Sequence, residues 1–170
     1  MVHRAAPATV ALAILAGPAL ALDYPEGTDP VFSEATEACL VANETGGFLP
    51  KALGWDGPDA GDPNVAAWET WNVGTASKTI DGVGRLALSA LVERYPGYQI
   101  GVCTITINEP LREIDAPPLK RAPGFTGTLQ GDPATWWGLW RTDDSTVFIR
   151  GYYNEAEIFE LSVKTIAVMP

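Results

Sequence analysis

Carboxylates are the most abundant reactive side chains of this 170-residue chain, which contains 21 Asp and Glu residues but one histidine and two cysteines. The histidine, His3, lies in an N-terminal segment that we expect to be removed on export. Without it the chain has no imidazole for a Ser-His-Asp or Cys-His nucleophile, or for a zinc site. An enzyme would therefore depend on carboxylates as acid and base. Neither Asp143-Asp144 nor Glu69 with Asp81 shows a spacing that fixes the separation needed for glycoside hydrolysis.

Two short motifs have the letters of cofactor-binding or catalytic sites but not their context. Gly82-x-Gly84-x-x-Ala87 matches the dinucleotide fingerprint, yet no acidic residue follows at the distance of about 20 positions that the fingerprint requires. Ser77 and Lys78 are adjacent, whereas a serine–lysine nucleophile needs the lysine one helical turn later. The sequence thus contains no recognisable catalytic motif, and we expect no cofactor.

A Gly- and Pro-rich stretch gathers oxygen ligands of the kind that calcium prefers, at Asp56, Asp59, Asp62 and Asn64. Their spacing does not fit a calcium-binding loop, and no glutamate closes the set. A solvated acidic turn explains them better. We therefore predict no metal site, while calcium binding by these four residues stays an open alternative.

Tryptophan is the most unusual feature of the sequence. Trp136, Trp137 and Trp140 lie within five residues, and Trp68 and Trp71 form a second group. On a strand, Trp136 and Trp140 would share one face and Trp137 the other. Flat indoles could stack on a sugar ring or pack on a partner's apolar residue. Because tryptophan is also largely buried on average, these residues could instead fill the core. We predict a binding surface at Trp136, Trp137 and Trp140.

The first 21 residues have the order of a signal peptide. Arg4 precedes an apolar run over Ala5–Ala16, and Ala19-Leu20-Ala21 forms a small-residue cleavage site. The run is shorter than a spanning helix, which needs about 20 apolar residues. We predict cleavage between Ala21 and Leu22, no stable membrane insertion afterwards, and a secreted or periplasmic protein. Residues 22–170 suit a single globular domain.

The charge of the cleaved chain narrows its possible partners. Ten basic residues would remain against 21 acidic ones. A nucleic-acid binder or a protein that binds anionic lipid needs a cationic surface, so both classes are disfavoured. The acidic residues are concentrated in the first third of the cleaved chain, over residues 22–69, where they could face a cationic partner or simply keep the protein soluble.

Cys39 and Cys103 are the two cysteines of a chain that we place in an oxidising compartment, which predicts one disulfide. A redox role is disfavoured because no C-x-x-C motif is present. Cys39 falls within a predicted helix. Asp29 caps this helix, Pro30 occupies its first position, and Gly46-Gly47 end it.

The rest of the chain predicts strands. Apolar residues alternate over 86–92 and 101–107, and the turn Tyr95-Pro96-Gly97-Tyr98 joins them as a hairpin. A helix over 86–95 is the competing interpretation. Val65–Val73 could be a strand or a helical turn, and Thr75–Asp81 is polar and expected to be exposed. A C-terminal meander is predicted over residues 125–130, 136–142, 146–153 and 158–168.

These elements predict an α+β fold, in which a mostly antiparallel sheet carries the N-terminal helix on one face and a disulfide joins the two. A β-sandwich with one short helix is the alternative. The residues favour an exported domain that binds a protein or a glycan, with a cationic protein best suited to the charge. The competing function is a carboxylate-dependent hydrolase acting on envelope or extracellular glycans. The oligomeric state is not predicted.

Overall fold

The computed structural model describes residues 24, 26–58, 70–114, 135–141, 144–153 and 157–169. The predicted signal peptide and cleavage site lie outside these residues, as does the predicted strand over 125–130. The signal peptide, its cleavage site and this strand stay predictions.

Helix α1 spans Pro30–Glu44 and begins and ends where its sequence signals predict. The Asp29 carboxylate accepts a hydrogen bond of 2.9 Å from the backbone N–H of Val31, which would otherwise have no partner within the helix. Thr45 is the C-cap, directly before Gly46-Gly47. A short 3-10 helix, η1 (Lys51–Leu53), follows. Among the described residues, no helix is long and apolar enough to cross a membrane.

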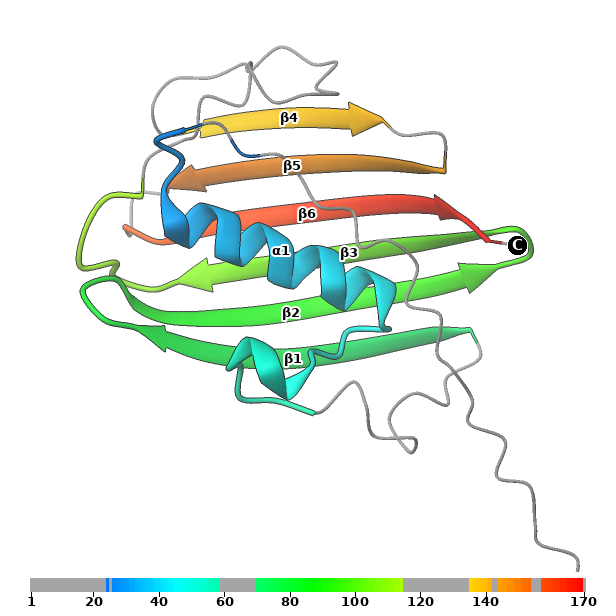
Figure 1. The fold of residues 1–170 in the computed structure, drawn as a ribbon, viewed down its shortest axis with the longest axis horizontal. Coiled ribbons are helices and arrows are strands. Elements are labelled where there is room, and N and C mark those ends of the chain that lie inside the picture. The colour runs from blue at the N-terminus through cyan, green and yellow to red at the C-terminus, as the bar shows by residue number, and fades with distance from the viewer. Residues whose placement is uncertain are drawn as a thin grey trace, which may run out of the picture.

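The described strands form one six-stranded antiparallel sheet in the order β1-β2-β3-β6-β5-β4, with α1 lying across one face (Figure 1). This arrangement confirms the predicted α+β class. The hairpin of β2 and β3 turns where predicted, so the competing helix over 86–95 is wrong. The last strand pairs with the third, which joins the C-terminal meander to the hairpin. The bounds of the strands are β1 Trp71–Ile80, β2 Gly84–Tyr95, β3 Tyr98–Ile107, β4 Thr135–Arg141, β5 Ser145–Tyr153 and β6 Phe159–Val168.

Strand β1 extends beyond what the sequence predicts. The polar stretch after Gly74 continues the strand to Ile80, paired with β2 along its whole length. Its inward side carries one large apolar residue, Ile80, at its end, and small or polar residues before it. Lys78, for example, forms an ion pair with Glu34 of α1 and donates a hydrogen bond of 3.0 Å to the carbonyl of Leu53. These contacts replace the apolar alternation on which strand prediction depends.

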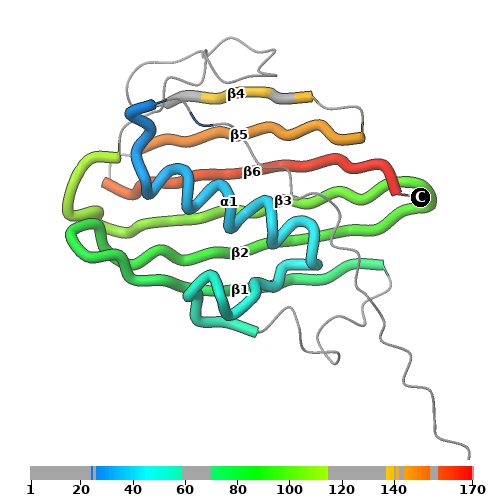
Figure 2. Tube along the Cα trace, in the orientation of Figure 1, coloured from blue at the N-terminus to red at the C-terminus, as the bar shows by residue number. Residues whose placement is uncertain are grey.

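The hydrophobic core lies between α1 and the face of the sheet that the helix covers (Figure 2). Phe32 of α1 and Ile105 of β3 are fully buried there, as are Phe159 and Val163 of β6. The disulfide between Cys39 and Cys103 crosses this core and joins the helix to β3, as predicted. The cross-link and the core therefore fix the helix to one face and leave the other face uncovered by it.

Tyr24 makes the free energy of unfolding depend on pH in the alkaline range. Its hydroxyl donates a hydrogen bond of 3.0 Å to Glu37, and its ring packs edge-on against Phe32. Burial, followed by the Glu37 charge, raises the pKa of Tyr24 far above its ordinary value of 10.0. Above pH 10 the unfolded chain therefore loses a proton that the folded chain keeps, so the free energy of unfolding falls as pH rises.

We expect Tyr24→Phe to flatten this alkaline decline by up to about 1.4 kcal/mol per pH unit, the slope that one proton contributes. The measurement is urea unfolding of both proteins at pH 8 and at steps between pH 10 and 11.5. Tyr153→Phe is a second test of the same effect: burial also raises the pKa of Tyr153, so this variant should flatten the decline as well. Parallel curves for Tyr24→Phe and wild type would contradict the assignment.

Candidate functional site

The sheet has two unlike faces, because side chains alternate along every strand. On β2 the residues that face α1, Leu86 among them, are buried, whereas Arg85 and Leu91 point the other way and are exposed. Helix α1 contacts β2, β3 and β6 from the covered side. We call the opposite side the open face.

Large apolar side chains gather at one end of the open face. Val73 lies opposite Leu91 in the register of β1 and β2, and Tyr98 lies opposite both Tyr95 and Val168. The group therefore runs across four neighbouring strands, at the end where β1 and β3 begin and β2 and β6 finish (Figure 1). We call it the apolar end patch: Trp71, Val73, Leu91, Tyr95, Tyr98, Ile166 and Val168, each between 38% and 65% exposed.

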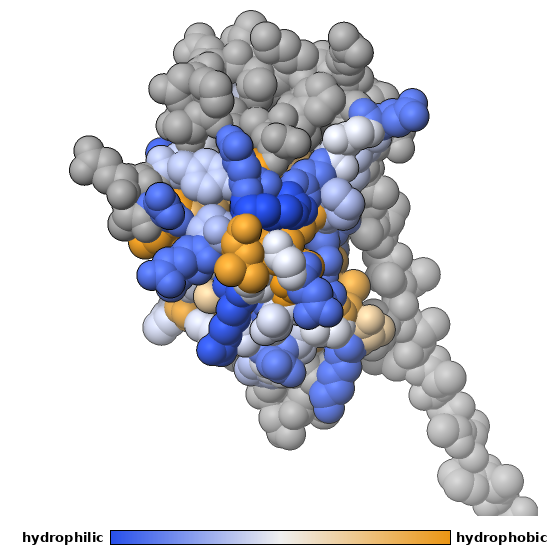
Figure 3. Space-filling view, turned by 90° about the vertical axis from the view of Figure 1, so that its left-hand side faces the viewer, coloured by the Kyte–Doolittle hydropathy of each residue, from blue (hydrophilic) through white to orange (hydrophobic). Residues whose placement is uncertain are grey.

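The apolar end patch differs from the opposite end of the sheet. That end, seen in Figure 3, is mostly hydrophilic over its described residues, with small apolar areas between the polar ones. Soluble monomers rarely expose large contiguous apolar areas. Where such an area is exposed, it usually marks a contact site. The patch is therefore the strongest candidate for a binding surface among the described residues.

A carboxylate lies within the apolar end patch. Glu93 lies opposite Trp71 on one side and Ile100 on the other. The Tyr95 hydroxyl donates a hydrogen bond of 2.7 Å to Glu93, and this bond is the main reason that the pKa of Tyr95 is raised. The ring of Tyr95 stacks on Tyr98 with centroids 4.8 Å apart. A negative charge framed by aromatic rings suits a cationic group, which the rings attract through their faces.

Serine and threonine side chains line the middle of the open face. Thr75, Ser89, Thr104 and Ser162 form one cross-strand row over β1, β2, β3 and β6. A shallow groove of about 550 Å³ lies over part of this row and extends to Asp56, Ser77 and Arg85. The Arg85 guanidinium donates a hydrogen bond of 3.2 Å to the Ser77 hydroxyl. This groove can offer hydrogen bonds to a polar ligand beside the apolar end patch.

The predicted tryptophan surface lies at the other edge of the sheet. Trp137 is half-buried, and its ring stacks on Phe148 of β5 with centroids 6.0 Å apart. The backbones of Trp136 and Trp140 pair with β5, but their side chains lie outside the described residues. The structure does not bring Trp137 to the apolar end patch, because β4 is two strands from β6 and Trp137 lies level with Ser162 rather than with Ile166.

The apolar end patch was missed in the sequence, although a signal for it is present. Leu91 falls on the same face as Arg85 and Glu93, and Ile166 and Val168 fall on the face of Lys164. In a half-buried strand these alternate positions are usually polar. Large apolar residues at positions expected to be polar are the signal that could have identified the patch.

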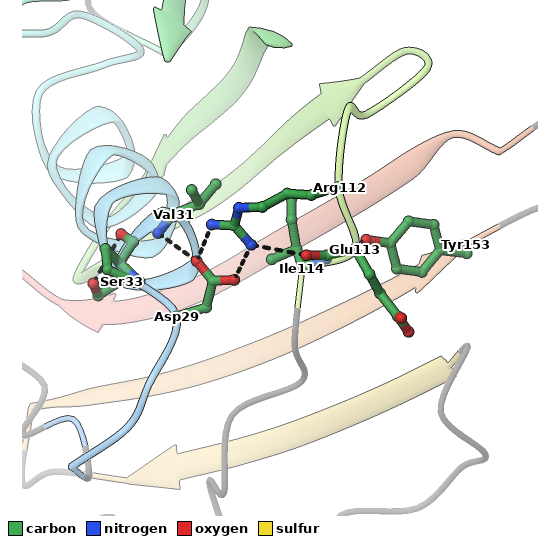
Figure 4. Close-up of polar contacts among 8 residues, drawn as sticks. Asp29, Val31, Ser33, Arg112, Glu113, Ile114 and Tyr153 are labelled. Carbon is green, nitrogen blue, oxygen red and sulfur yellow. Dashed lines mark hydrogen bonds and ion pairs between the residues drawn. The ribbon is translucent and has the colours of Figure 1, made fainter. Parts of the chain in front are cut away.

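A second cluster, at the N-terminus of α1, is structural (Figure 4). The two carboxylate oxygens of Asp29 accept hydrogen bonds of 2.6 and 2.9 Å from the Arg112 guanidinium. Arg112 also donates to the Glu113 carbonyl, and the Ile114 N–H donates to the Tyr153 hydroxyl. These groups tie the segment after β3 to α1 and β5. Their hydrogen bonds join members of the cluster to each other, which is why we assign the cluster a structural role.

Two further sequence features can be placed. Asn43-Glu44-Thr45 has the pattern of a glycosylation acceptor, but Asn43 is 1% exposed and its amide donates to the Val163 carbonyl. It is therefore inaccessible in the folded protein. Asp56 pairs with Ser77 through its backbone, while the other residues of the calcium alternative lie outside the described residues. Within the described ranges, no group of three or more His, Cys, Asp or Glu side chains could hold a metal ion.

Comparisons with protein-family models, with characterised proteins and with solved structures find no match to this chain, so the candidate site rests on its own geometry.

Proposed function

We propose that this chain is an exported binding domain that recognises a protein partner through the open face of its sheet. The observation that carries the proposal is the apolar end patch, which lies on the face that α1 does not cover. Exposed aromatic and aliphatic side chains of this kind anchor protein interfaces when a partner excludes water from them. The disulfide supports export, because such bonds persist in oxidising compartments.

The charge of the chain favours a cationic partner. The sequence has a formal net charge of −10, and Glu93 lies among the rings of the patch. Opposite charge on the partner would speed association and select against wrong partners. Trp136, Trp137 and Trp140, at the far edge of the sheet, stay a second proposed contact region; of the three, the register places Trp137 on the open face, opposite Arg150. A glycan is the alternative ligand, supported by the hydroxyl-lined groove near Arg85.

Site-specific photo-cross-linking in the cell that exports the protein tests the proposal. A photoreactive amino acid is placed at Trp71, Tyr98 or Val168 of the patch, and at Thr106 or Glu160 of the same face as controls. We expect protein adducts at the patch positions at least threefold more abundant than at the controls, because a docked partner lies within bond-forming distance only there.

Each variant must first show the thermal unfolding midpoint of the wild type. Equal adducts at Thr106 and Tyr98 would mean that contact is non-specific. If the patch variants fold but form no adducts, the protein-binding proposal is wrong and the glycan alternative is left. Binding of oligosaccharides to the immobilised domain would support that alternative.

A further inference from the structure

Two cations of the open face lack the kind of partner that Lys78 has near α1, where it pairs with Glu34. Lys164 of β6 and Arg150 of β5 are exposed, and neither forms an ion pair with any residue that the structure describes. Exposed cations on one face create a local positive potential there. This part of the open face can therefore attract an anion, although the formal net charge of the whole chain is −10.

Lys164 and Arg150 lie on either side of Ser162, on neighbouring strands (Figure 1). Arg150 is directly opposite Ser162 in the register, and Lys164 follows Ser162 by two residues on the same face of β6. Diagonal neighbours of this kind are about 7–8 Å apart. Two like charges at this distance repel each other, so the pair does not stabilise the fold. A negative charge beside Ser162 would interact favourably with both.

The carboxylate next to this pair in the register is that of Glu160, and it is hydrogen-bonded. It accepts a hydrogen bond of 2.7 Å from the Tyr152 hydroxyl. The Arg150 guanidinium lies over the same ring, 5.3 Å from its centre. Glu160 precedes Ser162 by two residues and Lys164 follows it by two, so an anion is favoured on the Lys164 side of Ser162.

Hydroxyl groups lead from these cations into the groove of the open face. Ser162 continues the cross-strand row of Thr75, Ser89 and Thr104, and the groove of about 550 Å³ lies over those three residues. Neighbouring strands are about 4.8 Å apart, so the row from Ser89 on β2 to Arg150 on β5 is about 14 Å long. It fits an extended ligand that has many hydroxyl groups and few charges.

The small number of cations selects a glycan among anionic ligands. Nucleic acids carry a charge on every unit and bind proteins by releasing many counterions, which needs a dense cationic surface. Here two cations adjoin a row of neutral hydroxyls. A glycan with one carboxylate among neutral sugar rings matches this arrangement, because each Ser or Thr hydroxyl can both donate to and accept from a sugar hydroxyl.

We infer that the open face binds an acidic oligosaccharide across β2, β3, β6 and β5, with a uronate carboxylate at Lys164 and sugar hydroxyls along Ser162, Thr104 and the groove. This inference goes beyond the proposed function, because none of these residues belongs to the apolar end patch. It assigns a second binding site and the chemical class of its ligand.

An amide NMR titration with two matched probes tests the inference. The first probe is xylotriose that carries one glucuronate, and the second is its methyl ester, which has the same sugar hydroxyls and no charge. We expect shifts centred on Thr104, Ser162 and Lys164, and at least fivefold tighter binding of the acid at low salt, where charges are least screened. Lys164→Gln should remove the preference for the acid, and Lys164→Arg should keep it.

Two further variants separate the contributions of charge and hydroxyl. Ser162→Ala should weaken the acid and the ester alike, because it removes a hydrogen bond that both make. Arg141→Gln removes one positive charge from the same face. Arg141 is four residues along β4 from Trp137, which is opposite Arg150, so it lies about 13 Å from the site. It should bind within twofold of wild type. Lys164→Gln should keep the thermal unfolding midpoint, since Lys164 has no described partner to lose.

Three results would overturn the inference: equal binding of the acid and the ester, undiminished binding of the acid by Lys164→Gln, or equally tight binding of the blocked peptide Ser-Ser-Glu-Ser, which would show attraction to any anion. Failure of the glycan probe with photo-cross-linking intact at the apolar end patch would leave the proposed function in place. Glycan binding without any cross-linking at the patch would instead remove the proposed function and keep this site.

Discussion

Cys39→Ala combined with Cys103→Ala should lower the free energy of unfolding by about 4 kcal/mol. The bond closes a loop with a sequence separation of 64, so its loss frees a long segment of the unfolded chain. Both residues are fully buried, and the bond holds α1 against β3. Alanine is preferred to serine as the replacement, because a buried hydroxyl without a partner would add its own cost.

Urea unfolding of wild type, reduced wild type and the double variant separates the contributions. Reduction removes the cross-link and keeps both sulfur atoms in the core, so the reduced protein should lie between the other two. A loss below about 1 kcal/mol in the double variant would show that packing alone fixes α1. Free thiols in the denatured, unreduced protein would show that the bond does not form.

Local signals were enough to predict α1, the hairpin and the last strand. Asp29 caps the helix and Pro30 begins it. Both signals act on neighbouring residues only, so the start of the helix can be predicted from the local sequence. Tyr95-Pro96-Gly97-Tyr98 turns the hairpin, where Gly97 has a φ of +84° that favours glycine. Strand β6 alternates apolar and polar residues on its two faces, which is the pattern of a half-covered sheet.

Strand β1 could not be predicted from alternation, because the backbone and a charge make inward contacts at two of its positions. Gly74 lies against the backbone of Gly47, and Lys78 pairs with Glu34 of α1. Partners so distant in the chain cannot be identified from composition. Thr75 and Ser77 on its open face then make the strand resemble a polar loop.

The apolar end patch depends on strand pairing that is remote in the sequence. Leu91, Ile166 and Val168 are each unusual at their own positions, but they form a surface only because β6 pairs with β3. The sequence predicted a meander without saying which earlier strand it joins. It therefore directed the site prediction to the tryptophans of β4, which are adjacent in sequence.

Gly74→Ala should strongly destabilise the end of β1 that carries Trp71 and Val73. A Cβ at residue 74 would lie 1.7 Å from the carbonyl oxygen of Gly47 and 2.3 Å from its carbon. Both atoms belong to the backbone, so no side chain can rotate to make room. Overpacking a core typically costs 1–3 kcal/mol, and we expect about 3 kcal/mol or more here because the obstacle is rigid.

Gly82→Ala is the control, because it measures the cost of replacing a glycine where no clash results. A Cβ at Gly82 meets nothing within 4 Å, so the φ of +73° is its sole penalty, about 1–2 kcal/mol. Chemical unfolding gives both free energies, and amide NMR locates the change. We expect Gly74→Ala to shift Trp71–Thr75 and the Gly46-Gly47 turn, where the Asn72 side chain donates to the Gly46 carbonyl. A loss smaller than that of Gly82→Ala, with unshifted β1 amides, would show that the Gly46-Gly47 turn is not packed on this strand.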